Sequence, residues 1–450
     1  MPSSLVFSAA YGSLGDVAPI LALAKEVLLA GSVEVESVTV IVNAYFQPHC
    51  AALVALGARV ETLGSAREYA ALIADADERW NKPQDVFATW LSGLEQHYGL
   101  LERLDEEAAS RGARATFVAH PLDLAVRILE EAKSVNAMTV LLQPWMLRTV
   151  GDQPNQFEYM PVFNCYPACI KAGVYKLQDL IVDSVFAGPI NAFRTKLGLA
   201  PVRRIYHTWF QCTGGLLGLW PEWLASDAPA HDWPERLRLC GFAFPSNASD
   251  SAPEHGADLS FPRGDMSDEL RAFIAGAKAA GVPLCVFTLG TSPPPYAARL
   301  FASATDACTR IGARALLLCS VEALLPPAPL PPHVMACSFA PFDVVLQHAA
   351  VFVYNGGFGG FSQALRAGCP QVIVPARFDQ PHNALMATKL GVGVRLPVRA
   401  LNPRRLAAAL RSAMAPRIAM KCKSFAATLA NDGGTGARVA AEHIVDFAAS

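Results

Sequence analysis

Short runs of apolar residues alternate along most of the chain with longer segments whose apolar positions recur at helical spacing. In the first half, turns and amphipathic segments follow the runs SLVFSA, VTVIVN and ATFVAH, and a fourth run, AMTVLLQP, comes after them. Alternating strand and helix signals are typical of parallel βαβ units. This part of the chain therefore predicts a doubly wound parallel sheet.

The alternation stops in the middle of the chain and then begins again. Residues 151–235 are rich in aromatic residues and prolines, and residues 244–268 are rich in Ser, Pro, Gly and Asp without periodicity. Strands such as PLCVFTLG and QVIVP then alternate with helical segments once more. Because 450 residues exceed what one core usually holds, we predict two Rossmann-like domains, residues 1–243 and 269–450, joined by the linker 244–268. The last helix is expected to pack back on the N-terminal domain.

Composition and charge narrow the class of protein. The net charge is -2 and there is no block of Lys or Arg, so we expect no nucleic-acid partner. The 11 cysteines are scattered, mostly within apolar runs, which favours buried thiols in a reducing compartment over a disulfide framework. The N-terminus has no basic segment before an apolar one, and no run is long enough to span a membrane. We expect a cytoplasmic protein, with peripheral contact to the inner face of the membrane left open.

A glycine-rich turn with an acidic residue follows the first predicted strand. It reads Gly12-Ser-Leu-Gly15-Asp16 and leads into a helix. Ligands of open parallel sheets bind outside such strand ends, so Asp16 is expected beside the ligand-binding cleft. The alternative is that Asp16 only caps the helix that follows. The spacing does not match G-x-G-x-x-G, which disfavours an oxidoreductase that binds a nicotinamide dinucleotide.

A second candidate lies after the predicted strand ATFVA. His120 and Asp123 follow this strand, so they could reach the same sheet edge as Asp16. A His near a carboxylate can act as a general base because its ordinary pKa is close to neutrality. The alternative is a structural His at a strand end.

The second half opens with small hydroxyl residues. The strand PLCVFTLG ends with Thr288 and Gly290, and Thr291 and Ser292 follow it. Hydroxyls and exposed backbone amides at this place suit phosphate oxygens. The alternative is a turn in which a Ser or Thr side chain accepts a backbone amide before the prolines.

Four glycines follow the strand AVFVY. Gly356, Gly357, Gly359 and Gly360 open the next predicted helix. A glycine-rich turn at a helix N-terminus presents free N–H groups and the positive end of the helix dipole, which favours a diphosphate. Tight packing alone could account for some of these glycines.

Polar residues also follow the strand QVIVP. Asp379 and Gln380 lie there, and Asn383 comes one helical turn later. Carboxylate and amide groups at a strand end can bind sugar hydroxyls. The alternative for Asp379 is an N-cap.

The sequence indicates no metal site and no cofactor. Asp75 and Asp77 form a D-x-D pattern, but it lies in a helical stretch with no apolar strand before it, so we interpret it as a solvated helix face. Cys165 and Cys169 lack a second pair at zinc-binding spacing.

Taken together and in this order, the motifs resemble those of family 1 glycosyltransferases of the GT-B fold. Residues 12–19 resemble the N-terminal motif G-[ST]-x-G-D-x-x-P, and residues 351–393 resemble the long donor motif with paired glycines and D-Q. The middle, from PINAFRTKLGL to DWPERLRLCGF, is most similar to the rhamnosyltransferases of rhamnolipid synthesis. The resemblance implies two Rossmann-like domains facing each other across a cleft, with the acceptor bound by residues 1–243 and a nucleotide sugar by residues 269–450.

The resemblance also implies the chemistry. It implies inverting, metal-independent transfer of a sugar from a nucleotide diphosphate donor to a hydroxyl. We expect a dTDP- or UDP-sugar as donor, with rhamnose as one candidate sugar, and the apolar, aromatic residues 140–225 favour a lipophilic acceptor. The family position of the base is occupied by Asp16, whereas the assignment of His120 as catalytic rests on our reasoning from the residues. The residues expected at the donor are Gly15, Thr288, Gly290, Thr291, Ser292, Phe339, Ala340, Asn355, Gly356, Gly357, Gly359, Asp379 and Gln380.

The donor motif departs from the family at one place. The family usually has a His immediately before the paired glycines or one position earlier, and this chain has Tyr354 and Asn355 there. Neither side chain can supply the positive charge of an imidazolium. A non-catalytic GT-B protein that binds a partner glycosyltransferase, or the donor without turnover, is therefore the alternative.

Overall fold

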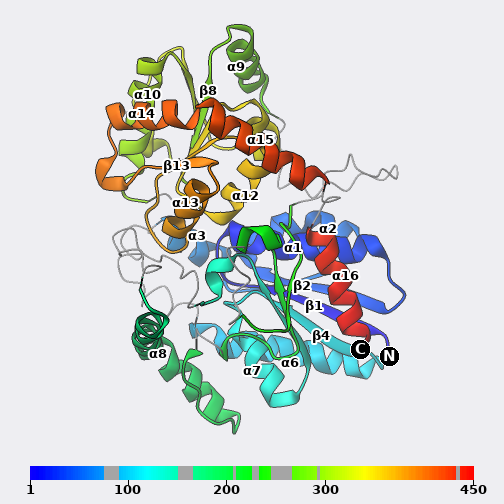
Figure 1. Cartoon of the computed structure of the whole chain (residues 1–450). Coiled ribbons are helices and arrows are strands. Elements are labelled where there is room, and N and C mark those ends of the chain that lie inside the picture. The colour runs from blue at the N-terminus through cyan, green and yellow to red at the C-terminus, as the bar shows by residue number, and fades with distance from the viewer. Residues whose placement is uncertain are drawn as a thin grey trace. The chain divides into compact units, whose positions relative to one another are not determined.

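The computed structural model of the protein describes residues 1–74, 91–149, 166–205, 209–225, 233–244, 266–290, 294–431 and 436–450. These residues form two compact units. The first contains the described residues up to 244 together with residues 436–450, and the second contains those from 266 to 431. Each unit has its own parallel sheet covered by helices (Figure 1). Residues 245–265 of the predicted linker 244–268 lie outside the described residues.

The first unit contains a seven-stranded sheet in the order β3-β2-β1-β4-β5-β6-β7. All its neighbouring strands are parallel. The strands are β1 (Ser3–Ala9), β2 (Val35–Asn43), β3 (Arg59–Leu63), β4 (Arg114–Ala119), β5 (Asn136–Leu141), β6 (Gly215–Gly218) and β7 (Leu237–Leu239). The strand order reverses direction between β1 and β4, so this pair is the switch point where open parallel sheets bind ligands. In this register Ser8 is opposite Ala119, so the segments that follow these two strands leave the sheet side by side.

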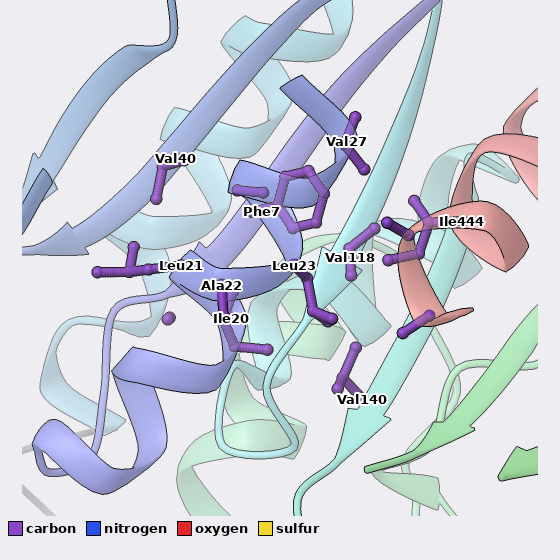
Figure 2. Packing of buried hydrophobic residues seen from close by; sticks show 14 of the residues in the cluster. Phe7, Ile20, Leu21, Ala22, Leu23, Val27, Val40, Val118, Val140 and Ile444 are labelled. Atoms are coloured by element: carbon purple, nitrogen blue, oxygen red, sulfur yellow. The ribbon is translucent and has the colours of Figure 1, made fainter. Parts of the chain in front are cut away.

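Most helices of the first unit lie on the faces of this sheet, whereas α8 (Ala168–Lys196) extends away from it (Figure 1). The helices of this unit are α1 (Leu14–Ala30), α2 (Ala51–Ala55), α3 (Ala66–Ala74), α6 (Leu94–Ser110), α7 (Leu124–Lys133), α8 and α16 (Gly436–Ala449). The chain's last helix, α16, packs against α1. Its buried face contributes to the same core as β1 and α1. Figure 2 shows Ile444 of α16 in that core with Phe7, Val118 and Val140 of the sheet.

The second unit contains a six-stranded parallel sheet in the order β10-β9-β8-β11-β12-β13. Its strands are β8 (Leu284–Thr288), β9 (Arg314–Leu318), β10 (Val334–Cys337), β11 (Val351–Tyr354), β12 (Gln371–Ile373) and β13 (Gly393–Arg395). The order reverses between β8 and β11. Val353 is opposite Phe287, so the segments after these strands also leave the sheet side by side.

The helices of the second unit alternate with most of its strands, except that the described segment between β9 and β10 contains no α-helix and two of the unit's helices follow β13. They are α9 (Asp268–Ala279), α10 (Ala297–Ile311), α11 (Phe342–Val345), α12 (Phe358–Ala367), α13 (Gln380–Lys389), α14 (Pro403–Ala413) and α15 (Pro416–Asn431). The core beneath them lies between α10, α14 and the sheet, with Phe287, Phe301 and Leu410 fully buried in it.

The doubly wound parallel sheet expected in each half is confirmed. Four short strands were not predicted. β6 is the most instructive, because its sequence GLLG lies in the aromatic middle segment and carries no β-branched residue. Met138 and Leu239 lie where Cβ atoms on Gly215 and Gly218 would be, so close packing favours glycine at both positions. The position of this strand therefore depends on tertiary packing, which cannot be predicted from a local sequence pattern.

Candidate active site

Asp16 lies at the switch point of the first sheet, in the first turn of α1. Its Oδ2 accepts hydrogen bonds from the backbone N–H of Ser13 at 2.6 Å and from the Ser13 hydroxyl at 2.9 Å. Gly12 has a positive φ of 102°, and a Cβ there would lie 2.7 Å from Asp16 Oδ2. The glycine is therefore required for the carboxylate to fold back over the turn. Asp16 therefore does cap the start of α1, and only its Oδ2 takes part in the cap.

His120 meets the other oxygen of Asp16. Its Nε2 lies 3.5 Å from Asp16 Oδ1, and its side chain is fully buried, whereas the Asp16 side chain is 33% exposed. The backbone N–H of Leu122 donates to His120 Nδ1 at 3.2 Å. Since Nδ1 accepts, the proton of the neutral ring is on Nε2 and points to Asp16. In this arrangement His120 directs Nε2–H toward Asp16, although the 3.5 Å separation is too long for a hydrogen bond of full geometry, and the ring has no lone pair left with which to accept a substrate proton.

Electrostatics at Asp16 favour its charged form. Burial alone would raise the pKa of Asp16, but the Nε2–H of His120 and the two Ser13 donors, which face the carboxylate, hold that pKa below its usual value. Asp16 is thus ionised at neutral pH. A partly exposed carboxylate with one oxygen held in a cap and the other beside an imidazole can accept a proton from a hydroxyl.

Gly15 occupies the exposed side of the first turn of α1. A Cβ there would contact only the Ser13 hydroxyl, at 3.5 Å, which is an ordinary distance. The fold therefore tolerates a small side chain at this position, and no internal contact explains the glycine.

The glycines after β11 have different structural roles. Gly356 has a φ of 95°, and a Cβ there would lie 2.7 Å from Ile373 Cγ2. A Cβ on Gly360 would lie 2.9 Å from the Tyr354 ring. Close packing thus explains why residues 356 and 360 are glycines. A Cβ on Gly359 would meet nothing within 4 Å, so its side of the first turn of α12 is open. The amides of such a first turn have no partner within the helix and suit an anion.

Tyr354 and Asn355, which stand where the family has a His, both face other parts of the unit. Tyr354 is buried, stacks on Phe352 and donates from its hydroxyl to Gln371 Oε1 at 2.7 Å. Asn355 donates to the carbonyl of Leu289 at 3.1 Å and accepts the Gly357 N–H at 3.2 Å. Asn355 therefore ties the glycine turn to the end of β8 and takes up one of the amides expected at the diphosphate.

Asp379 and Gln380 begin α13. Asp379 Oδ2 accepts from the Asn383 side chain at 2.7 Å, and the same Asn383 nitrogen donates to the Gly356 carbonyl at 2.8 Å. This buried amide therefore links the Asp379 turn to the glycine turn. Gln380 Oε1 accepts the amides of residues 376 and 377, at 3.0 and 3.2 Å. Because the side-chain oxygen of Gln380 accepts these two backbone amides, its side-chain nitrogen is the group suited to donate to a ligand oxygen.

The residue before Asp379 was not among the sequence candidates. Phe378 has a φ of 57°, in the left-handed region that bulky residues rarely adopt. Such strain costs about 1–3 kcal/mol and persists where the surrounding structure imposes it, often at ligand sites. Nothing in the local sequence signals this conformation.

The remaining donor candidates lie at the ends of β8 and β10. Thr288 Oγ1 accepts the Gly290 N–H at 3.3 Å, which is the turn named as the alternative. Phe339 is 49% exposed and Ala340 is buried, so an aromatic face is open to stacking beside a small residue. Thr291 and Ser292 lie outside the described residues.

Two further sequence candidates, the D-x-D pattern and the cysteine pair, concern metal binding. Asp75 and Asp77 lie outside the described part of the chain, as does Cys165. The described residues contain no cluster of three or more His, Cys, Asp or Glu side chains placed to hold a metal ion. None of the described helices is both long and apolar enough to cross a bilayer.

Comparison with known sequences identifies relatives. Residues 309–443 match the family model described as erythromycin biosynthesis protein CIII-like, C-terminal domain. The O-mycaminosyltylonolide 6-deoxyallosyltransferase of Streptomyces fradiae is 27% identical over 54% of this chain and 53% of that protein. The vancomycin aglycone glucosyltransferase of Amycolatopsis orientalis is 29% identical over 58% of this chain and 57% of that protein. The chain spans about half the length of the curated relatives it matches.

Comparison with solved structures covers the whole chain. The glycosyltransferase of kitacinnamycin has a TM-score of 0.68 at 22% identity, over 99% of each chain. The glycosyltransferase VinC, solved in complex with dTDP, has a TM-score of 0.60 at 19% identity, over 100% of this chain and 99% of that one. The chain therefore has the GT-B fold of glycosyltransferases, and its residues 309–443 are similar to the C-terminal domain of the erythromycin biosynthesis protein CIII family.

Proposed function

We propose that the protein is an inverting, metal-independent glycosyltransferase that moves a sugar from a nucleotide diphosphate donor to a hydroxyl of a lipophilic acceptor. The observation that carries the proposal is the Asp16–His120 pair at the switch point of the first sheet. An ionised carboxylate beside a buried imidazole at a ligand-binding sheet edge suits removal of a proton from a hydroxyl.

In the proposed reaction Asp16 is the general base. The acceptor oxygen forms a bond to the anomeric carbon as the bond from that carbon to the diphosphate oxygen breaks. The hydroxyl proton passes to Asp16 Oδ1, and the bonding pair leaves with the nucleoside diphosphate. His120 positions the carboxylate by donating from Nε2, because its Nδ1 already accepts the Leu122 amide.

The second unit would bind the donor. The open first turn of α12 at Gly359 offers N–H groups and the helix dipole to the leaving diphosphate. Asp379 and Gln380 would bind sugar hydroxyls, and Phe339 would stack on the nucleotide base. The solved complex of VinC with dTDP supports a dTDP-sugar as donor, and the resemblance in the middle of the chain favours rhamnose as the sugar.

A lipophilic acceptor is supported by helix α8. Four large apolar side chains of this helix are exposed, at Ile170, Leu177, Leu180 and Ile181. They recur within about one third of the helix circumference, so they form one apolar stripe. Such a stripe suits a lipid-like or macrocyclic acceptor, or peripheral contact with a membrane.

The test is a donor and acceptor screen read by mass spectrometry. The protein is incubated with dTDP-rhamnose, dTDP-glucose and UDP-glucose, together with a hydroxyalkanoic acid or a macrolide aglycone. We expect one donor to yield a glycosylated product. If no sugar is transferred and no donor is hydrolysed, calorimetry with dTDP and UDP separates the alternatives, since donor binding without turnover indicates a non-catalytic GT-B protein.

A matched pair of glycine variants tests the diphosphate position. Gly359→Ala adds a methyl group into open space, so we expect unchanged thermal stability and a loss of dTDP affinity of about tenfold or more. Gly360→Ala is the control, because its methyl group would lie 2.9 Å from the Tyr354 ring and lower stability instead. Unchanged dTDP affinity in Gly359→Ala, measured by calorimetry, would place the diphosphate elsewhere.

A further inference from the structure

Asp123 follows the His120 turn and occupies the N-cap position of α7, but it does not cap the helix. Its backbone N–H donates to the His120 carbonyl at 2.9 Å, and its side chain accepts no cap hydrogen bond. An Asp at this position usually accepts an amide of the first helical turn. Here the residue is 2% exposed, and its carboxyl group is directed elsewhere.

The carboxyl group of Asp123 instead faces the carboxyl end of β1. The Ser8 hydroxyl and the amides of Ala10 and Tyr11 act on it electrostatically, yet neither oxygen has a hydrogen bond of full geometry. Tyr11 contributes a buried hydroxyl that also has no hydrogen bond. Burying a carboxyl group without a complete hydrogen-bond shell destabilises a fold, and native proteins keep such groups chiefly at functional sites.

A buried histidine orders the donors around Asp123. His97 of α6 is fully buried, and its Nε2 lies 3.0 Å from Ser8 Oγ. Burial lowers the pKa of His97 to about 3, so the ring stays neutral and can donate one N–H to Ser8. Ser8 then has its own proton free to donate onward, which it can direct to Asp123. His97 can thus orient the Ser8 hydroxyl so that its proton faces Asp123.

We propose that Asp123 is a positioning residue for the Asp16–His120 pair. As a carboxylate it attracts the donors at the end of β1 and holds the segment that leads to Asp16 against the turn that carries His120. Protonation of Asp123 removes this attraction and loosens the pair. The proposal rests on the proposed function, because the pair is the machinery that Asp123 serves.

The ionisation of Asp123 is separate from that of Asp16. Burial raises the pKa of Asp123 to about 7, against the lowering effects of the nearby His120 ring and of the Ser8, Ala10 and Tyr11 donors. Burial and the Asp123 charge raise the pKa of Tyr11, so its hydroxyl remains a donor near neutrality. Activity should therefore rise as pH increases through about 7, where Asp16 is already ionised.

The stability should change in the opposite direction. Because the folded pKa of Asp123 is higher than its unfolded value, the folded state binds more protons between about pH 4 and pH 7. The free energy of unfolding thus falls as pH rises through this window. The Asp123→Asn variant should lack this fall.

The first experiment measures kcat and KM of Asp123→Asn against pH. We expect kcat to fall about tenfold or more at about pH 8, KM to change little, and the activity rise near pH 7 to disappear. Asp105→Asn is the matched control, since burial also raises the pKa of this α6 carboxyl, which interacts with Lys133 instead. Wild-type kcat and an unchanged pH profile in Asp123→Asn would overturn the proposal.

A second experiment does not depend on turnover. In wild-type protein labelled with ¹⁵N-tyrosine, the Tyr11 amide signal, assigned with Tyr11→Phe, should shift with a midpoint near pH 7. Asp123→Asn should abolish that midpoint, and Ser8→Ala should move it upward if the first variant does not fold. A Tyr11 amide that is insensitive between about pH 5 and pH 9 would overturn the proposal. If the titration is present but no sugar is transferred, the proposed function fails and the coupling stands.

Discussion

Asp16→Asn is expected to lower kcat at least about a hundredfold while dTDP affinity stays unchanged. The variant keeps an amide oxygen that can accept the Ser13 N–H, so the start of α1 should remain folded. It loses the negative charge and the basic oxygen beside His120. Turnover is measured by mass spectrometry and nucleotide binding by calorimetry on the same preparation.

Ser13→Ala is the control that separates the base from the cap. It removes the hydroxyl that donates to Asp16 at 2.9 Å and leaves the carboxylate in place. Loss of an N-cap hydroxyl typically costs about 0.5–2 kcal/mol of stability. We expect a lower melting temperature with kcat within a few-fold of wild type. Wild-type turnover in Asp16→Asn, with the same stability loss in both variants, would leave Asp16 a capping role only.

The position of Asp16 was predictable from local sequence, but its partner's role was not. A strand, a glycine turn and an acidic residue indicate a sheet-edge site without further information. That β1 and β4 are neighbours depends on the order of strands, and the proton position on His120 depends on the Leu122 amide. The strand order is a tertiary fact, and the contact with the Leu122 amide depends on the detailed geometry of the turn, so the sequence alone left His120 as an ordinary candidate base.

The donor motif shows the same limit in the second unit. The sequence identified the glycines after β11 only as a group, whereas the structure shows that packing requires some of them and not others. Gly356 and Gly360 are explained by Ile373 and Tyr354, and Gly359 is not explained by any neighbour. The direction of Tyr354 follows strand alternation, since it lies on the same face of β11 as Phe352 and stacks on it. Asn355 accepts the nearby Gly357 amide, but it donates to Leu289, which follows β8 and is distant in sequence.

The junction of the C-terminal helix with the first unit depends on one close backbone approach. A Cβ on Gly436 would lie 2.2 Å from the Gly241 carbonyl oxygen and 2.7 Å from that of Cys240. These are backbone atoms, which cannot rotate away as a side chain can. The Gly436 N–H also donates to the Phe242 carbonyl at 3.0 Å. A methyl group at this position must therefore displace the first turn of α16 from the segment after β7.

Gly436→Ala is thus expected to destabilise the first unit by about 3 kcal/mol, the upper end of ordinary overpacking, because displacement also disturbs the α1–α16 core. All 7 tryptophans precede residue 244, so tryptophan emission during urea unfolding reports on this unit alone. Gly99→Ala is the control: it lies in α6 with nothing within 4 Å of its added Cβ and should gain up to about 1 kcal/mol. An unchanged tryptophan midpoint in Gly436→Ala would mean that α16 contributes little to the fold of the N-terminal sheet, despite its share of that core.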